Sequence, residues 1–370
     1  MQTTVRRSAR AALVLALCLA VPSQRAARAA PAAKPRLCIE YLPAIVYDDE
    51  AITLCGRVEA EGGPAAFQYT ASLLDRSERV LASHLERGAA KPGQPWRCRT
   101  SLRPKSGTPH ALLVRLATPK AGSTLASVRV PILSGQARLP ALTAKGTRLA
   151  DAEGRLVLVR IQHRVWERKD TWPLFRWIGH KLYGDTWSVS RALVLGDDLG
   201  MPEGGYLGRL GTHRSPSIHV LRVASQGSGA SPSALRAVAL LSRTALDATP
   251  GLALLSLGWR EPDVGADVME FGKTLELIVQ QLERRGCERV LVLGPGGPPG
   301  LRKRLAPYAA AARRVAHTYD GRFVALAPAL TDAHFLSGAA DSPLRLRLPN
   351  AAGHAALADA ILATLKKITR

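Results

Sequence analysis

The second half of the chain alternates short apolar segments with longer amphipathic ones, and this pattern constrains the fold most. We predict strands over 192–195, 218–224, 252–257, 289–293 and 323–326, and helices over 233–248, 264–285, 301–319 and 351–368. Such alternation is typical of a parallel sheet covered by helices on both faces. The sequence therefore predicts a three-layer α/β domain with a parallel sheet over 188–370, whose ligand crevice lies at the carboxyl ends of the strands.

The first half shows a different pattern, with short apolar runs separated by glycine- and proline-rich turns. Expected strands cover 39–47, 52–58, 67–74, 79–82, 96–101, 110–116 and 124–133. Seven short strands without helical periodicity predict an immunoglobulin-like β-sandwich over 36–134. Residues 135–187 are predicted to connect the two domains, with one strand over 155–161. This connector holds Trp166, Trp172, Trp177 and Trp187 among basic residues, which suits either packing between the domains or contact with a sugar.

The first 29 residues have the features of a secretory signal peptide. Arg6, Arg7 and Arg10 precede an apolar run over 11–22, and Ala27-Arg28-Ala29 resembles a cleavage site. The run is shorter than the roughly 20 residues that a membrane-spanning helix requires. We therefore expect an exported protein, periplasmic or extracellular, with no transmembrane segment after cleavage.

The net charge of +22 favours polyanionic partners, because such a charge attracts any polyanion at long range. Lysine and arginine are nevertheless spread along the chain, without a basic block of five or an aromatic RNA-binding motif. This argues against nucleic acid. The charge is then that of a generally basic exported protein, for which anionic glycans or other cell-envelope polymers are the partners that would suit it.

Four cysteines follow the predicted signal peptide: Cys38, Cys55, Cys98 and Cys287. Their spacing matches no zinc motif. An even number permits disulfides in an oxidising compartment. Cys55 and Cys98 lie in two expected strands and are the pair we favour, whereas Cys287 is equally compatible with a buried free thiol.

Four short motifs fall at the carboxyl ends of the expected strands or at the last helix. They are Val194-Leu195-Gly196-Asp197-Asp198-Leu199, Ser228-Gly229-Ala230-Ser231, Ser256-Leu257-Gly258-Trp259-Arg260-Glu261 and the segment from Arg345 to His354. In order and spacing they resemble the conserved blocks of SGNH/GDSL hydrolases, a family of esterases, lipases and acylhydrolases. That resemblance covers about residues 190–370, and it implies a flavodoxin-like, three-layer parallel-sheet fold. It implies a catalytic serine, an Asp-x-x-His pair, and an oxyanion hole with a glycine and an asparagine.

Most of the residues at these family positions differ from the family pattern. Asp198 stands at the nucleophile position and Arg260 at the position of the oxyanion-hole asparagine. Arg345 and Leu348 replace the aspartate and the histidine. Only the glycine is kept, as Gly229, with Gly227 as the alternative alignment. Leucine cannot accept a proton, and a hydroxyl needs a base to become a nucleophile. The usual triad is therefore absent, and we predict a catalytically inactive protein.

Three other interpretations of these positions stay open. Asp198 could attack as a carboxylate with His334 or His354 as the base, which would make the protein a divergent esterase acting on carbohydrate or lipid esters. Asp198 and one arginine could instead fill the crevice as a buried ion pair. Alternatively, Asp198, Arg260, Arg345 and Arg347 could bind an anion, because guanidinium groups suit carboxylate, sulfate and phosphate. A purely structural role would require only a protein partner.

No cofactor or metal is expected from the sequence. The stretch Gly294-Pro295-Gly296-Gly297-Pro298-Pro299-Gly300 follows a strand but lacks the lysine and hydroxyl residue of a phosphate-binding loop. Its prolines also remove amide donors, so it is expected to form a stiff turn.

Overall fold

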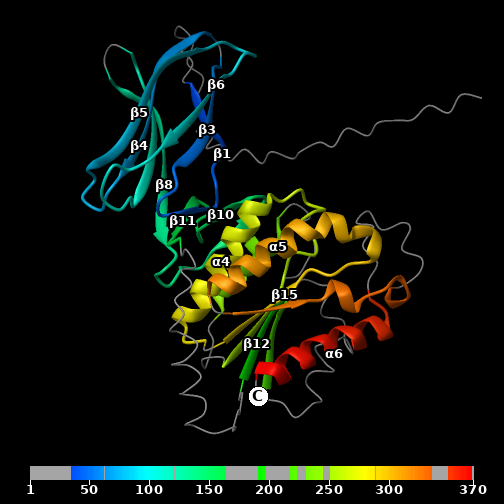
Figure 1. Ribbon diagram of the computed structural model, residues 1–370. Coiled ribbons are helices and arrows are strands. Elements are labelled where there is room, and N and C mark those ends of the chain that lie inside the picture. Colours follow the sequence, from blue (N-terminus) through cyan, green and yellow to red (C-terminus); the bar gives the residue numbers. More distant parts are fainter. Residues whose placement is uncertain are drawn as a thin grey trace, which may run out of the picture.

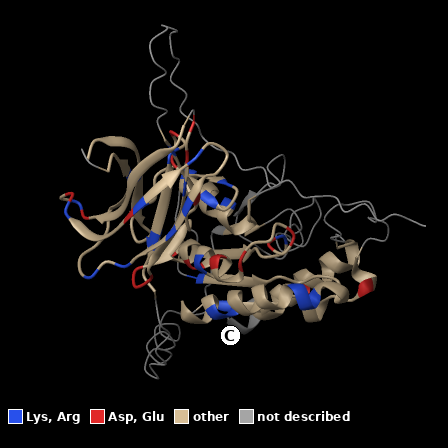
Figure 2. Ribbon diagram, turned by 90° about the horizontal axis from the view of Figure 1, so that it is seen from above, with Lys and Arg blue, Asp and Glu red and all other residues tan. Residues whose placement is uncertain are grey.

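The computed structural model describes residues 35–61, 63–119, 122–163, 191–196, 217–222, 231–244, 251–287, 289–319, 321–335 and 349–368. A β-rich part forms the first half and an α/β domain the second (Figure 1), and Figure 2 shows Lys and Arg residues, in blue, on both of them. The predicted signal peptide and the four tryptophans of the connector lie outside the described residues. Within those residues, no helix combines the length and apolar content needed to cross a membrane.

The α/β domain is built on a five-stranded parallel sheet, as predicted. Its strands are β12 (Arg191–Gly196), β13 (Ser217–Arg222), β14 (Leu252–Ser256), β15 (Arg289–Gly294) and β16 (Arg322–Ala325). They lie in the order β13-β12-β14-β15-β16, and every neighbouring pair is parallel. Numbered within the domain, this is the order 2-1-3-4-5 of flavodoxin-like folds.

Helices cover both faces of this sheet and complete three layers. The helices are α3 (Ser233–Arg243), α4 (Val268–Arg284), α5 (Arg302–Thr318) and α6 (Ala351–Ile368). Along the strands, apolar side chains alternate between two cores. Leu193 and Leu195 face α3, α4 and α5, whereas Val194 faces α6. This alternation follows from the two-residue period of a strand, and Figure 1 shows α6 on the side of the sheet away from α4 and α5.

The predicted helix boundary at residue 264 is wrong, because α4 begins at Val268. Asp267 caps it, and its side chain accepts hydrogen bonds from the backbone N–H of Met269 at 2.8 Å and of Glu270 at 3.1 Å. An aspartate at this position satisfies amides that have no partner within the helix. The preceding residues 260–264 form a turn instead.

Two sheets make up the β-rich part. The first contains β1 (Arg36–Tyr41), β3 (Ile52–Glu59) and β6 (Trp96–Leu102). The second contains β2 (Ile45–Tyr47), β4 (Ala65–Leu74), β5 (Val80–Ala90), β7 (Ala111–Ala117), β8 (Thr124–Ser134), β9 (Thr143–Lys145), β10 (Arg148–Ala150) and β11 (Leu156–Ile161). Buried residues of both sheets form one hydrophobic core, with Leu54 on the first sheet and Phe67 and Leu112 on the second among its members. An immunoglobulin type of sandwich stays a prediction.

Three details of the β-rich part differ from expectation. The expected strand over 39–47 is broken into β1 and β2 at Leu42-Pro43. Strand β5 continues to Ala90, well past the predicted end at residue 82. Within the expected connector, β9, β10 and β11 extend the sheet of β8, and β11 pairs in parallel with both β8 and β2.

The favoured pairing of Cys55 with Cys98 is wrong, because both thiols are free, as is that of Cys38. In the ladder between β3 and β6, Cys98 lies opposite Gly56, and Cys55 lies opposite Arg99. Successive residues of a strand point to opposite faces of the sheet. The two sulfur atoms therefore lie on different sides of this pair of strands.

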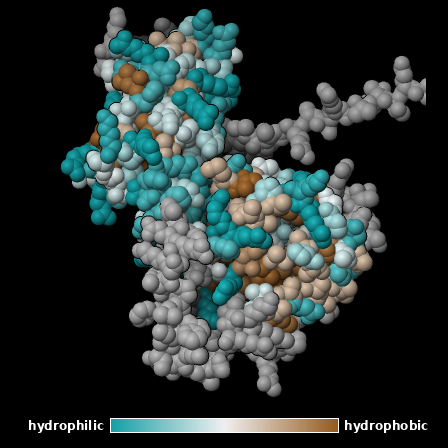
Figure 3. Space-filling model, viewed as in Figure 1, coloured by the Kyte–Doolittle hydropathy of each residue, from teal (hydrophilic) through white to brown (hydrophobic). Residues whose placement is uncertain are grey.

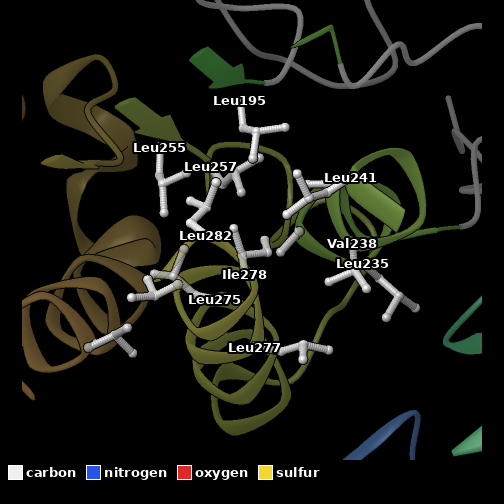
Figure 4. Packing of buried hydrophobic residues seen from close by; sticks show 14 of the residues in the cluster. Leu195, Leu235, Val238, Leu241, Leu255, Leu257, Leu275, Leu277, Ile278 and Leu282 are labelled. Carbon is white, nitrogen blue, oxygen red and sulfur yellow. The ribbon is translucent and has the colours of Figure 1, made fainter. Parts of the chain in front are cut away.

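Helix α4 joins the two parts of the molecule. One side packs on the α/β sheet, and Figure 4 shows Leu275, Ile278 and Leu282 directed toward Leu255 and Leu257. Leu277 points to the other side, and the same core includes Ile45 of β2 and Val159 of β11. Helix α4 is buried from Phe271 to Leu282, although this stretch includes polar residues such as Lys273 and Glu276.

Polar side chains of α4 also bond to the β-rich part. Glu276 accepts hydrogen bonds from the hydroxyl groups of Tyr47 at 2.7 Å and Tyr319 at 2.8 Å. Gln281 donates to the backbone oxygen of Ala137 at 2.9 Å. Burial and the bond to Glu276 raise the pKa of Tyr47 well above its usual value. Glu276 and Gln281 thus have partners in the β-rich part, as the burial of polar groups requires.

Candidate functional site

The carboxyl ends of β12 and β14 lie side by side at the centre of the sheet. Gly196 pairs with Ser256 on one side and Arg222 on the other. The strand order reverses between these two strands, and ligands of open parallel sheets bind at such a point. The first and third sequence motifs therefore meet where the fold places a ligand crevice. Asp198, two residues beyond Gly196, lies outside the described residues.

The loop after β14 turns sharply at Gly258. Its φ angle is +103°, a backbone conformation that side-chain-bearing residues rarely adopt. A β-carbon at this position would lie 3.0 Å from Cζ of Phe271 and 3.4 Å from Cγ of Pro295. The backbone conformation of this turn therefore requires glycine. After the turn, Trp259 is buried in the core beneath α6, whereas Arg260 is half-buried.

Glu261 is fully buried and connects this loop to α3. Its Oε1 accepts a hydrogen bond of 2.9 Å from the backbone N–H of Ala234, in the first turn of α3. The residue that caps α3 is Pro232, whose side chain offers no acceptor, so Glu261 supplies one from another segment. Ser231, the last residue of the second motif, is also buried. The third motif is therefore bonded to the first turn of the helix that follows the second motif.

Burial raises the pKa of Glu261 above its ordinary value, although the backbone amide of Ala234 and the charge of Arg236 oppose this. Because the pKa is raised in the folded protein, the folded state binds the proton of Glu261 more tightly than the unfolded state does. The protonated carboxyl therefore stabilises the protein fully below its ordinary pKa near 4.5, and this stabilisation is lost as the pH rises through the folded-state pKa. Glu261→Gln keeps an oxygen for Ala234 without the charge. Above pH 7 we expect the variant to be more stable than the parent by about 1–3 kcal/mol.

Urea unfolding between pH 4 and 8 tests this expectation. The advantage of the glutamine variant should shrink toward pH 4, where the parent carboxyl is neutral. Glu153→Gln, at an exposed turn of the β-rich part, is the control. The difference in unfolding free energy between this variant and the parent should not change with pH. Parallel pH profiles for the parent and Glu261→Gln would contradict the assignment.

Arg260 lies in a group of charged residues that the sequence did not reveal. Its charge and that of Arg304 lower the pKa of Asp263, whereas burial, the larger effect, raises it. Arg304, at the start of α5, approaches Asp263 at 3.4 Å and donates to the backbone oxygen of Pro262 at 3.2 Å. The loop thus brings two arginines and one carboxylate to the carboxyl edge of the sheet.

The end of the fourth motif begins helix α6. The Asn350 side chain accepts from the backbone N–H of Gly353 at 2.9 Å and donates to the backbone oxygen of Ala333 at 2.7 Å. His354 is buried in the first turn of the helix. Pro349 forms a β-bridge with Phe335, and Phe335 shares a core with Trp259 and α6. The third and fourth motifs are therefore packed together.

His334 and His354, the two histidines considered as bases, each lie where they hold local structure together. The Nδ1 of His334 accepts a hydrogen bond of 3.0 Å from the backbone N–H of Thr331 and closes a short capped turn over Asp332–His334. His354 lies inside the helix start. Neither observation supports a base at the crevice. Gly229, Arg345, Arg347 and Leu348 lie outside the described residues.

Sequence reasoning missed Glu261 and Asp263. The signal that could have found Glu261 is its position directly after the motif residue Arg260, because a carboxylate that follows a buried strand and a buried tryptophan must itself find a partner. Asp263 gave no comparable signal, since its partner Arg304 comes from another element.

Comparison with known proteins yields matches only among solved structures. No protein-family profile matches the chain, and no curated protein sequence does. The matching structures include LAE5, an α/β hydrolase enzyme from the metagenome of Lake Arreo, Spain, at 20% identity and a TM-score of 0.38, covering 49% of this chain and 97% of that one. A variant of Axe2, an acetyl xylan esterase from Geobacillus stearothermophilus, matches at 18% identity and a TM-score of 0.38, covering 49% and 96%. The esterase EstA from Pseudoalteromonas matches at 16% identity and a TM-score of 0.35, covering 48% and 98%.

At these identities the matches concern the fold alone and carry no conclusion about activity. The assignment of the α/β fold rests on the observed strand order and layers. The solved structures to which about half of this chain is similar are SGNH/GDSL-type esterases and hydrolases, the family that the four motifs resemble.

Proposed function

We propose that this chain is an exported, SGNH-hydrolase-like binding protein that holds an anionic cell-envelope ligand, such as an acidic glycan, without hydrolysing it. The observation that carries the proposal is the position of Arg260. It follows the Gly258 turn at the strand-order reversal, where the related family is expected to have an oxyanion-hole asparagine. An arginine there offers a charged fork to a carboxylate or sulfate.

The residues around Arg260 support the binding of a ligand more than its hydrolysis. The described part of the crevice edge contains Arg260, Arg304 and the partly buried Asp263. We propose that Asp198, Arg345 and Arg347 complete the ligand site, and that Gly229 and Leu348 occupy the remaining family positions. Export is inferred from the leader sequence. The β-rich part, inferred to be an immunoglobulin-like sandwich, and the aromatic connector would present the α/β domain at the envelope.

Binding can be tested by the thermal shift of the purified protein with polygalacturonate, and with uncharged dextran as the matched polymer. We expect polygalacturonate, and not dextran, to raise the melting temperature. Arg260→Ala should weaken this binding about 10- to 100-fold, since a hydrogen bond to a charged group is worth about 1.5–3 kcal/mol. Arg322→Ala is the control, because Arg322 is exposed and begins β16 at the opposite edge of the sheet.

Turnover of p-nitrophenyl acetate separates this proposal from the esterase alternative. We expect no turnover above that of Asp198→Ala. Turnover that disappears in Asp198→Ala would establish an aspartate nucleophile and overturn the binding proposal. Equal melting shifts with both polymers, or equal losses for Arg260→Ala and Arg322→Ala, would remove the support for an anion site at this edge.

A further inference from the structure

A groove of about 560 Å³ lies between α5 and strand β16, apart from the crevice at β12 and β14. Its lining is mostly alanine, glycine, proline and larger apolar residues, joined by four basic ones. The lining residues that matter here are Ala306, Ala310, Arg313, Arg314, His317 and Phe323. The lining extends from Arg302 to His317, so it follows α5 for about 22 Å at 1.5 Å per residue.

In the described part of the chain, the groove lies where β16 is only partly covered on its α5 face. Val324 points into the core beneath α6 and is buried. Phe323 and Ala325 point to the α5 side, where Phe323 is half-buried and Ala325 is exposed. Strands of parallel sheets are normally covered on both faces. Within the described residues, the α5 side of this edge strand therefore lacks part of its cover.

The walls of the groove are basic and contain no acidic residue. Arg302 is held by the backbone oxygens of Ala327 and Leu330, at 2.9 and 2.5 Å. The guanidinium of Arg313 lies 5.0 Å from the centre of the Phe323 ring, a stacking contact that keeps it at the groove. No aspartate or glutamate is among the lining residues. The charge of the groove therefore suits a negatively charged occupant.

The shape of the groove suits a helix. Ala306 and Ala310 are exposed one turn apart on α5, and such small side chains let a second helix approach closely. Figure 3 shows hydrophobic surface, brown and tan, among teal hydrophilic residues on the face of the α/β domain around α5 and α6. A second copy of this chain is disfavoured as the occupant, because its α5 would place arginine against arginine, and like charges across an interface oppose binding.

We propose that this groove docks an acidic amphipathic helix of a partner protein. Leucine-like side chains of that helix would pack on Phe323 and the alanines, and its carboxylates would pair with Arg313 and Arg314. This is the helix-in-groove mode of recognition. The proposal is independent of the anion site at the crevice, since the two sites share none of the residues named for binding.

The test uses fluorescence anisotropy in 0.15 M salt with two labelled 18-residue helical peptides. Both carry leucines at helical spacing, flanked by glutamates in one peptide and by lysines in the other. We expect the full chain to bind the glutamate peptide only. Arg313→Glu should weaken binding at least about tenfold. Lys303→Glu makes the same charge change at an exposed position of α5 outside the groove lining, and should change the affinity less than twofold.

A second variant tests the groove without changing charge. Ala310→Trp fills the space between α5 and β16, and it should also weaken binding at least tenfold while unfolding as cooperatively as the parent. Three results would overturn the proposal: no binding of the glutamate peptide, equal losses for Lys303→Glu and Arg313→Glu, or full binding by Ala310→Trp. Binding of dodecanoate in place of the peptide would likewise overturn it, as evidence for an aliphatic ligand.

Discussion

Replacing Gly353 by alanine is expected to destabilise the protein by about 1–3 kcal/mol, the cost typical of overpacking a tight site. In most helices the same change is favourable by roughly 0.5–1 kcal/mol. Here a β-carbon would lie 2.3 Å from the backbone oxygen of His334 and 3.0 Å from Cβ of Pro349. The obstacle is backbone, which cannot rotate away. The start of α6 would therefore have to move off the loop at His334.

Gly300→Ala is the matched control, because no atom lies within 4 Å of its β-carbon position and its φ angle is not positive. It should leave the stability unchanged or raise it slightly. Urea unfolding of the two variants beside the parent measures the difference. If Gly353→Ala were as stable as Gly300→Ala, the close contact between α6 and the His334 loop would not exist in solution.

Lys273→Met is expected to lower the stability by about 2–3 kcal/mol. The side chain of Lys273 is 3% exposed, and its ammonium lies 2.6 Å from Glu50 and 3.2 Å from Glu270. Removing one partner of a buried pair costs about 3–5 kcal/mol, because a charge is left uncompensated. The two carboxylates are each 35% exposed, so water reduces this cost.

The loss should depend on pH in a defined direction. Without the lysine, Glu50 and Glu270 face each other as like charges, which favours their protonated forms. The variant should therefore recover stability as the pH falls from 7 toward 4. Lys303→Met, on the exposed side of α5, should cause little change at any pH. A deficit for Lys273→Met that stays constant with pH would show that lost packing, not charge, is responsible.

The α/β fold could be predicted from the sequence because its strands are apolar and its helices amphipathic. The predicted strand over 289–293 became β15 and the predicted helix over 351–368 became α6, with the same end residues for the helix. The order of the strands was implied only by the flavodoxin-like fold class that came with the resemblance, and no single residue predicts it. The start of α4 was missed because Val264 continues the apolar spacing, whereas the capping bonds of Asp267 end the preceding turn.

The β-rich part was harder to predict, since pairing between distant strands leaves little local trace. Strand β9 has only three residues and is held by its ladder to β10. Likewise, the favoured pair Cys55 and Cys98 failed on register: a shift of one residue places two side chains on opposite faces. Nothing in the local sequence specifies that shift.

The location of the site stays a prediction, because most of its family positions lie outside the described residues. The described residues show how the ends of the first and third motifs pair, and which partners Glu261 and Asp263 have. The bond from Glu261 to α3 and the pairing of Asp263 with Arg304 depend on side chains from separate elements. Charges near one another in space but distant along the chain leave no periodic pattern, so only the folded arrangement reveals them.

The burial of α4 between two sheets has a consequence for the order in which the protein is made. Ile45 of β2 and Val159 of β11 belong to the first half of the chain, yet they share a hydrophobic core with a helix formed from residues 268–284. Domains generally fold as the ribosome releases them, amino-terminal part first. The nascent β-rich part therefore exposes an apolar surface until synthesis has passed Arg284. Only then can α4 pack between the two sheets and cover it.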